Sequence, residues 1–113
     1  MNATVYKILP ARLWSDAIET GSFRGSPVDV ADGFIHFSTA AQVRETAAKH
    51  FAGMSDLVLV AVPVSDLGPS LKWEPSRGGD LFPHLYSPLA VERAIWVQPL
   101  PIAADGRHIF PEL

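Results

Sequence analysis

The sequence predicts an α+β domain, and the order of its helical and strand patterns is the main reason. Two helical patterns, at 10–21 and 39–53, lie in the first half of the chain. Strand patterns lie at 4–9, 34–38, 56–64 and 92–100, and the later chain is rich in strands and turns. Because the helices come early and the strands late, the pattern favours α+β over a doubly wound parallel sheet.

Length and composition indicate a single domain, 1–113, with a core of its own. Of the 113 residues, 48% are hydrophobic and 19% are charged, which is unlike a disordered chain. The nine Lys and Arg residues are scattered and the net charge is −3, so no nucleic-acid-binding patch is predicted. The lack of cysteine excludes a thiol nucleophile, a disulfide framework and cysteine-ligated zinc.

The apolar segments are those of a protein without a membrane anchor. The longest apolar run, at 57–64, is far shorter than the roughly 20 residues that a membrane-spanning helix needs. The N-terminal stretch has no uninterrupted apolar segment followed by a cleavage site, so a secretory signal is not predicted. We therefore expect a cytoplasmic protein with no membrane partner.

The first third of the chain predicts a strand, a helix and a long loop. The strand covers 4–9, and Pro10 begins the helix, since proline is tolerated at the first helical position. Gly21 ends this helix, whose predicted core face carries Leu13, Trp14, Ala17 and Ile18. The polar segment 22–33 is long for a connection inside a compact domain and is rich in turn-forming residues. We interpret it as a mobile lid.

The middle third predicts a strand that contains a histidine, then a helix and a buried strand. In the strand 34–38, Ile35 and Phe37 share one face, while Phe34, His36 and Ser38 share the other. Thr39 and Gln42 match a capping box, and Gly53 supplies the stop of the helix that follows. The run 56–64 is apolar on both faces, which is typical of a central strand.

Each of two later segments places polar side chains together on one face of a predicted strand. In "LKWEPSR", Lys72 and Glu74 share a face opposite Trp73, and in "FPHLY" the shared face holds Phe82, His84 and Tyr86. Together with the strand 34–38 they give a candidate site of His36, Ser38, Glu74, Arg77, His84 and Tyr86. The set combines bases that titrate near neutral pH, a carboxylate and a guanidinium that can bind a phosphate or carboxylate.

Each candidate also has a purely structural interpretation. His36 can be a packed core histidine, Ser38 can simply precede a helix cap, and Glu74 with Arg77 can form a surface ion pair. The three tryptophans, Trp14, Trp73 and Trp96, are predicted to lie in the core. The sequence has no phosphate-binding loop, no nucleophile elbow and no helical histidine pair. Zinc is therefore weakly supported, and the alternative is that His36, Glu74 and His84 converge on a metal.

Two blocks, "SPVDVADGFIHFSTAAQV" and "LKWEPSRGGDLFPHLYSPL", resemble the signature blocks of the bacterial family filed as domain of unknown function 952. The resemblance covers nearly the whole chain, from "YKIL" to "IWVQPL". It implies a fold similar to the ADP-ribosyltransferase superfamily, an ADP-ribosylation-like split and mostly antiparallel β core flanked by two main helices. It also implies NAD or a nucleotide-like molecule as the ligand.

The residues match the catalytic pattern of ADP-ribosyltransferases only in part. In that superfamily an early strand supplies an Arg or His, a second motif supplies Ser-Thr-Ser or Tyr, and a late strand supplies Glu. Here the first strand offers Tyr6 and Lys7, "HFST" contains Ser38 and Thr39 without the third serine, and Glu74 lies outside a Glu-x-Glu segment.

Three hypotheses about function follow from the candidate site. In the first, the chain is an enzyme acting on a nucleotide or NAD-like substrate, with His36 as base, Glu74 stabilising positive charge and Arg77 holding a phosphate. In the second, the same residues only bind a small anionic metabolite. In the third, they satisfy one another in a structural interaction domain. The first two require that the side chains of His36, Glu74, Arg77 and His84 line one cleft, with His36 within about 8 Å of at least one of the others.

Overall fold

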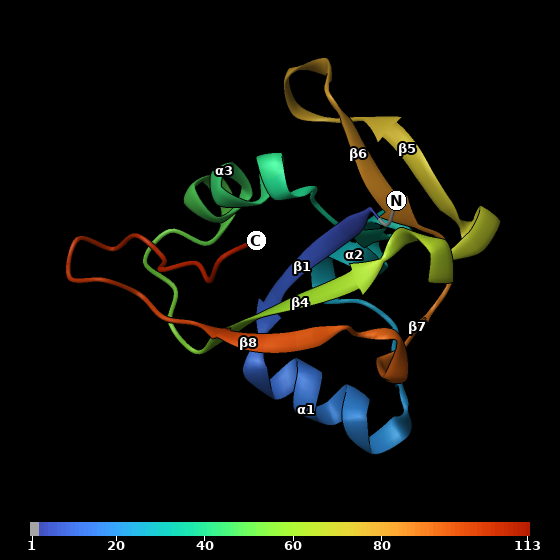
Figure 1. Cartoon of the computed structure of the whole chain (residues 1–113), viewed down its shortest axis with the longest axis horizontal. Helices are drawn as coiled ribbons and strands as arrows, with labels where there is room; N and C mark the ends of the chain where they lie inside the picture. The colour runs from blue at the N-terminus through green and yellow to red at the C-terminus, as the bar shows by residue number, and fades with distance from the viewer. Residues whose placement is uncertain (1–2) are drawn as a thin grey trace.

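The computed structural model describes residues 3–113, apart from the side chain of Arg77, and confirms a mixed fold with antiparallel sheets (Figure 1). The helices are α1 (Ala11–Thr20), α2 (Pro27–Asp32) and α3 (Ala40–His50). The strands are β1 (Thr4–Pro10), β2 (Ser22–Phe23), β3 (Ile35–His36), β4 (Leu57–Pro63), β5 (Leu71–Pro75), β6 (Leu81–Leu85), β7 (Leu89–Ala90) and β8 (Trp96–Leu100). Short 3-10 turns follow β4 and β5 and precede β5 and β8.

The described strands form three sheets, of order β1-β4-β8, β3-β6-β5 and β2-β7. Every pairing in them is antiparallel. The first two sheets are joined where Tyr6 and Ser38 exchange backbone hydrogen bonds of 2.8 and 2.9 Å. This bridge holds the chain just after β3 against β1, and it therefore fixes where His36 lies relative to the first sheet.

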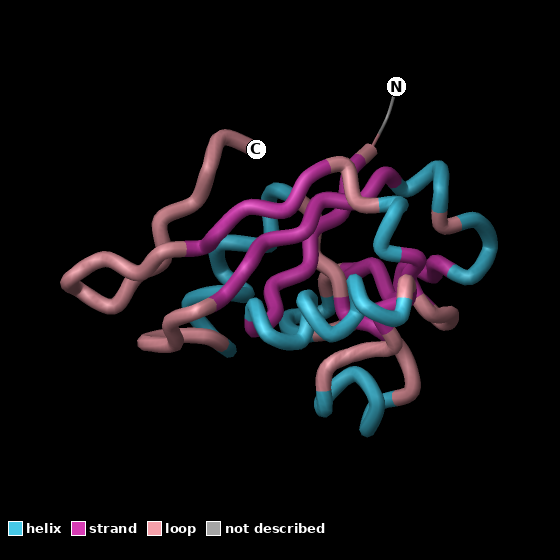
Figure 2. Tube along the Cα trace, turned by 90° about the horizontal axis from the view of Figure 1, so that it is seen from below, coloured by secondary structure: helices cyan, strands magenta, loops and turns pink. Residues whose placement is uncertain are grey.

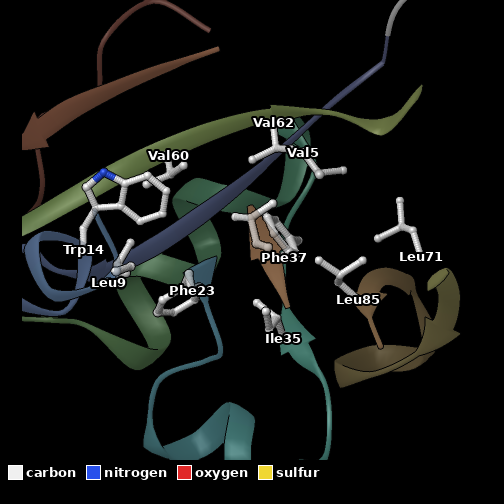
Figure 3. Close-up of a cluster of buried hydrophobic side chains, with 12 residues drawn as sticks. Val5, Leu9, Trp14, Phe23, Ile35, Phe37, Val60, Val62, Leu71 and Leu85 are labelled. Atoms are coloured by element: carbon white, nitrogen blue, oxygen red, sulfur yellow. The ribbon is translucent and has the colours of Figure 1, made fainter. Parts of the chain in front are cut away.

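The core lies on both faces of the β1–β4 pair. Val5 and Leu9 contribute to one cluster, which includes Trp14 from α1 and Phe37 (Figure 3). Tyr6 and Ile8, which alternate with them along β1, belong to a second cluster built with Val43, Ala47 and other residues. Lys7 lies between Val5 and Leu9 in the sequence and is only 5% exposed. It is a charged interruption in a buried strand.

Several predicted elements are confirmed with small shifts in their ends. The central strand is β4, which pairs with both β1 and β8. Gly21 ends α1 with a φ of 86°, a left-handed conformation that favours glycine. Thr39 and Gln42 form the expected capping box, but α3 ends at His50, before Gly53. The chain after β8 is largely loop and projects at one end of the molecule (Figure 2).

Other predictions were wrong. Segment 22–33 is not an irregular loop, because it contains β2 and α2 and includes a side chain, Asp29, that is 1% exposed. Its role as a mobile lid stays a prediction. The strand at 34–38 shortens to β3, and the strand at 92–100 begins only at Trp96, after a 3-10 turn. Trp73 is 43% exposed and Ile18 is 56% exposed, so neither belongs to the core.

Candidate functional site

The buried carboxylate of Asp29 accepts hydrogen bonds from Lys7, Ser26 and His36. Asp29 is therefore the hub of a polar network. It is the third residue of α2, and its Oδ2 accepts hydrogen bonds from the backbone N–H of Ser26 at 2.8 Å and from the Ser26 hydroxyl at 2.9 Å. Lys7 Nζ lies 3.0 Å from Oδ1 and 2.9 Å from Oδ2. His36 donates to Oδ1 from its backbone N–H at 3.1 Å and from its ring Nδ1 at 2.6 Å.

These bonds offset the cost of burying two charges. An unpaired buried charge is costly, and a buried ion pair is tolerated when hydrogen bonds satisfy its remaining groups. Burial alone would raise the pKa of Asp29, but the hydrogen bond from His36, the charge and hydrogen bond of Lys7 and the amide of Ser26 outweigh it and hold this pKa far below its usual range. Burial lowers the pKa of Lys7, and Asp29 opposes that shift.

Asp29 should make the stability of the protein depend on pH. The pKa of Asp29 is lower in the folded chain than in the unfolded chain. The ionised group therefore stabilises the fold fully above the ordinary Asp value of about 3.9, and this contribution is lost as the pH falls toward the folded-state pKa. We expect a lower free energy of unfolding at about pH 3 than at about pH 6 in urea titrations. The loss should be smaller in Asp29→Asn; equal acid sensitivity of both proteins would contradict this.

His36 connects α2 to β3 through both of its ring nitrogens. Nδ1 lies 2.6 Å from Asp29 Oδ1, and Nε2 lies 2.9 Å from Asp32 Oδ2. Ionised carboxylates only accept hydrogen bonds, so both contacts are hydrogen bonds when the imidazole is doubly protonated. The His36 side chain is 34% exposed and the Asp32 side chain 48%. The Nδ1 side of the ring is thus anchored in the interior, and the Nε2 side is open to solvent.

His84 lies directly opposite His36 in the β3–β6 register and is 5% exposed. Its Nδ1 is 2.8 Å from Glu74 Oε1, which also accepts a hydrogen bond from the Tyr86 hydroxyl at 2.6 Å. The bond from Tyr86 and then that from His84 lower the pKa of Glu74, and the same carboxylate raises the pKa of Tyr86. Within the part of the chain that the structure describes, His84 Nε2 makes no hydrogen bond.

The aromatic ring of Phe34 contacts both histidines and Tyr86. It stacks on His84 with ring centroids 4.1 Å apart, and it also contacts His36 at 4.6 Å and Tyr86 at 5.2 Å. The centroids of the two histidine rings are 5.6 Å apart, edge to face. The structure thus places His36 and His84 within the expected separation.

Both histidines line a cavity of about 590 Å³. Lys7 from β1 and Arg12 from α1 also line it, together with residues of α2 and the end of α3. Of the other predicted residues, Ser38 lines the cavity, where its hydroxyl lies 2.9 Å from that of Thr46. A second cavity, of about 700 Å³ between α3 and the C-terminal loop, contains none of the predicted residues.

The remaining predicted residues take different positions. Glu74 was predicted to line the same cleft as His36 and His84, but neither it nor Tyr86 is among the described residues that line the cavity. They lie behind His84, on the β5–β6 pair, and contact it through the Glu74 carboxylate. The side chain of Arg77 lies outside what the structure describes, although its neighbour Ser76 lines the cavity.

The sequence prediction missed Lys7, Asp29 and Asp32 as members of the network. The signal for Asp29 was present, because "SPVD" has the serine, the proline and the acidic residue of a helix start. The signal for Lys7 was a charge in the middle of an apolar strand. Among the residues that the structure describes, no three His, Cys, Asp or Glu side chains are grouped so that they could hold a metal ion. None of the described helices is long and apolar enough to cross a membrane.

The comparison with known proteins settles the family. The family model described as Protein of unknown function (DUF952) matches residues 8–97. The chain belongs to this family. None of the curated proteins matches the chain.

Solved structures of a bacterial protein are similar to this member of the DUF952 family. The X-ray structure of CC0527 from Caulobacter crescentus is 51% identical and has a TM-score of 0.91, and the match covers 94% of this chain and 93% of that one. The solution NMR structure of CC0527 is 52% identical with a TM-score of 0.83, and covers 92% and 90%. The two chains therefore share their fold over nearly their whole lengths.

Proposed function

We propose that the cavity beside His36 and His84 binds a small anionic ligand of the nucleotide or NAD-like class. The observation that carries this proposal is the pair of histidines, each with Nδ1 on a carboxylate, which line one cavity with ring centroids 5.6 Å apart. A carboxylate on Nδ1 fixes the direction of an imidazole ring. Two rings fixed in this way provide hydrogen-bonding groups at defined positions for a ligand.

The charge and size of the cavity support an anionic ligand. The described lining contains Lys7 and Arg12, three histidines and one acidic side chain, Asp32, although the whole chain has twelve acidic and nine basic residues. Lys7 is already paired with Asp29, so Arg12 supplies the charge for an anion. The volume of about 590 Å³ falls in the range of roughly 300–1,000 Å³ that is typical of small-molecule sites. Phe37 and Phe82 also line the cavity and supply apolar surface for a ring.

The proposal includes a fold relationship to ADP-ribosyltransferases and, with it, an enzymatic role. The split into separate antiparallel sheets, with α1 and α3 as the longer helices, is compatible with that relationship. In the enzymatic form of the proposal, His36 contributes to catalysis directly and Glu74 contributes through His84. Ser38, Arg77 and His84 contribute to binding, and Tyr86 supports Glu74. The contact between Glu74 and His84 supports a role for Glu74 through that histidine.

A structural role is the second candidate, and Asp29 is the observation that favours it. Lys7, Ser26 and His36 satisfy this carboxylate entirely from within the protein. Such a closed network needs no ligand. The binding proposal therefore depends on His84 and the cavity rather than on Asp29.

Thermal unfolding in the presence of AMP, NAD⁺ or inorganic phosphate tests the binding proposal. A ligand at about 100 times its dissociation constant adds about 2.7 kcal/mol to the stability of the folded protein. We expect at least one of these probes to raise the unfolding temperature in a saturable way. The effect should weaken in Arg12→Gln, because Arg12 is exposed and lines the cavity.

Arg93→Gln is the matched control, because Arg93 is also exposed but does not line the cavity. Binding that is weakened equally by both substitutions would locate the ligand elsewhere. The absence of any stabilisation by the three probes would leave the structural role as the better account.

A further inference from the structure

We propose that His84 and His36 act as general base and general acid in the hydrolysis of a phosphate diester bound in the cavity. This inference rests on the proposed function, because it requires an anionic ligand in that site. It adds a reaction, a substrate class and a separate role for each histidine.

His84 has the arrangement of a base. Glu74 Oε1 lies 2.8 Å from its Nδ1, and an ionised carboxylate accepts the proton of that nitrogen. In the neutral ring the other nitrogen, Nε2, then carries a lone pair and no proton. The bond from Tyr86 lowers the pKa of Glu74, as does the bond from His84, so the carboxylate stays ionised at neutral pH. Glu74 is thus a positioning residue that fixes the tautomer of His84.

His36 has the arrangement of an acid. Both of its ring nitrogens lie on carboxylates, at 2.6 Å from Asp29 and 2.9 Å from Asp32, and both bonds are made only when each nitrogen carries a proton. The Asp29 side chain is 1% exposed and holds its side of the ring. Asp32 is 48% exposed, so it can turn away and leave the Nε2 proton to a ligand oxygen.

The two roles are compatible with one reacting phosphorus atom. The ring centroids are 5.6 Å apart, and both rings line the same cavity, so an acceptor and a donor can serve opposite sides of one small group. Arg12 in the lining offers positive charge for the non-bridging oxygens, whereas the charge of Lys7 is already paired with Asp29. Fixed charges of this kind stabilise the extra negative charge of a phosphoryl transition state.

The step balances with water as the only co-reactant. The oxygen of a water molecule bonds to phosphorus while His84 Nε2 takes one of its protons. The bond from phosphorus to the leaving oxygen breaks, and that oxygen takes its electron pair and a proton from His36 Nε2. The products are a phosphate monoester and an alcohol. Exchange with solvent returns a proton to His36 and removes one from His84.

Two probes with different leaving groups separate the two roles. The first is the p-nitrophenyl ester of thymidylate, whose nitrophenolate leaves without a proton. The second is the dinucleotide of two thymidines, whose leaving alkoxide needs one. Neither probe has a ribose hydroxyl beside the phosphate, so water is the nucleophile in both.

We expect the unsubstituted protein to hydrolyse both probes. His84→Gln should lower both rates by about 100-fold or more, because general base catalysis contributes about this much. His36→Gln should lower the dinucleotide rate by a similar factor and leave the nitrophenyl ester much less affected. His108→Gln is the matched control, since His108 does not line this cavity; it should leave both rates unchanged.

Glu74→Gln provides a second variant in case the buried His84 is needed for folding. It should lower kcat on both probes with KM unchanged, because Glu74 acts through His84 rather than on the substrate. One outcome is that a probe stabilises the protein saturably, that this stabilisation requires His84, and that the probe is not hydrolysed. That outcome would overturn the acid–base inference and leave the binding proposal standing. If the unsubstituted protein neither is stabilised by the probes nor hydrolyses them, both the binding proposal and the acid–base inference are overturned. If His36→Gln lowers the two hydrolysis rates equally, the role of His36 as the acid is overturned.

Discussion

Replacing Asp29 with alanine is expected to destabilise the protein by about 3–5 kcal/mol, which is the usual result of breaking a buried ion pair from one side. The substitution leaves Lys7, whose side chain is 6% exposed, as a buried charge without its carboxylate. It also removes the acceptor of the His36 ring and of the backbone N–H of Ser26. Chemical denaturation measured at neutral pH would give the loss directly.

Asp32→Ala is the control for this result. Asp32 lies on the same helix and also bonds to His36, but its side chain is 48% exposed, so the loss should stay below about 1 kcal/mol. The double variant Asp29→Ala with Lys7→Met should be more stable than Asp29→Ala alone, because the unpaired charge is gone. A loss below about 1 kcal/mol in Asp29→Ala, or no recovery in the double variant, would show that Asp29 is not the hub.

Trp14→Ala is expected to cost about 3–5 kcal/mol, the range for truncating a large buried aromatic side chain. Trp14 is 6% exposed and lies against Phe23, with ring centroids 6.2 Å apart. It anchors α1, the helix that brings Arg12 to the cavity, to the core. Thermal or denaturant unfolding would measure the loss.

Trp73→Ala makes the same chemical change at a position that is 43% exposed. Little cavity is created there, so the loss should be below about 1 kcal/mol. Similar losses for the two variants would mean that the core does not depend on α1 as the structure indicates.

Local patterns predicted the elements whose cause is local. The apolar run at 56–64 became the central strand β4 because a strand that is apolar on both faces must be covered on both. Thr39 with Gln42 began α3, and Gly21 ended α1, because a capping box and a left-handed glycine act within a few residues. These are short-range interactions that neighbouring residues determine by themselves.

Segment 22–33 shows where local reasoning stops. Its glycines, serines and aspartates suggest an open loop, and α2 has only six residues. The caps of α2 are local, at Ser26 and Gly33, but the bond that holds the helix to β1 joins Asp29 to Lys7, which lies 22 positions earlier in the chain. A pairing over that distance depends on how the chain folds back on itself, which composition does not reveal.

For the candidate site, too, the sequence predicted local features but not the contacts between distant segments. Alternation along the strands placed Glu74 with Lys72 on one face and His84 with Tyr86 on another, but it could not show that the two faces meet. The antiparallel registers that set His84 opposite both His36 and Lys72 are long-range features. Trp73 was misplaced for a related reason. It lies on β5, at the edge of its sheet, where one strand face remains open to solvent.

An anionic ligand is proposed to bind beside His36 and His84, the two histidines anchored by carboxylates. The most direct measurement is the set of imidazole nitrogen resonances of His36, His84 and His108, followed by NMR during a titration with AMP. We expect the His36 and His84 resonances to shift together and saturate with one dissociation constant, while those of His108, which does not line the cavity, stay in place. Resonances of His36 and His84 that remain unchanged while AMP stabilises the protein, or equal shifts of all three histidines, would contradict the claim.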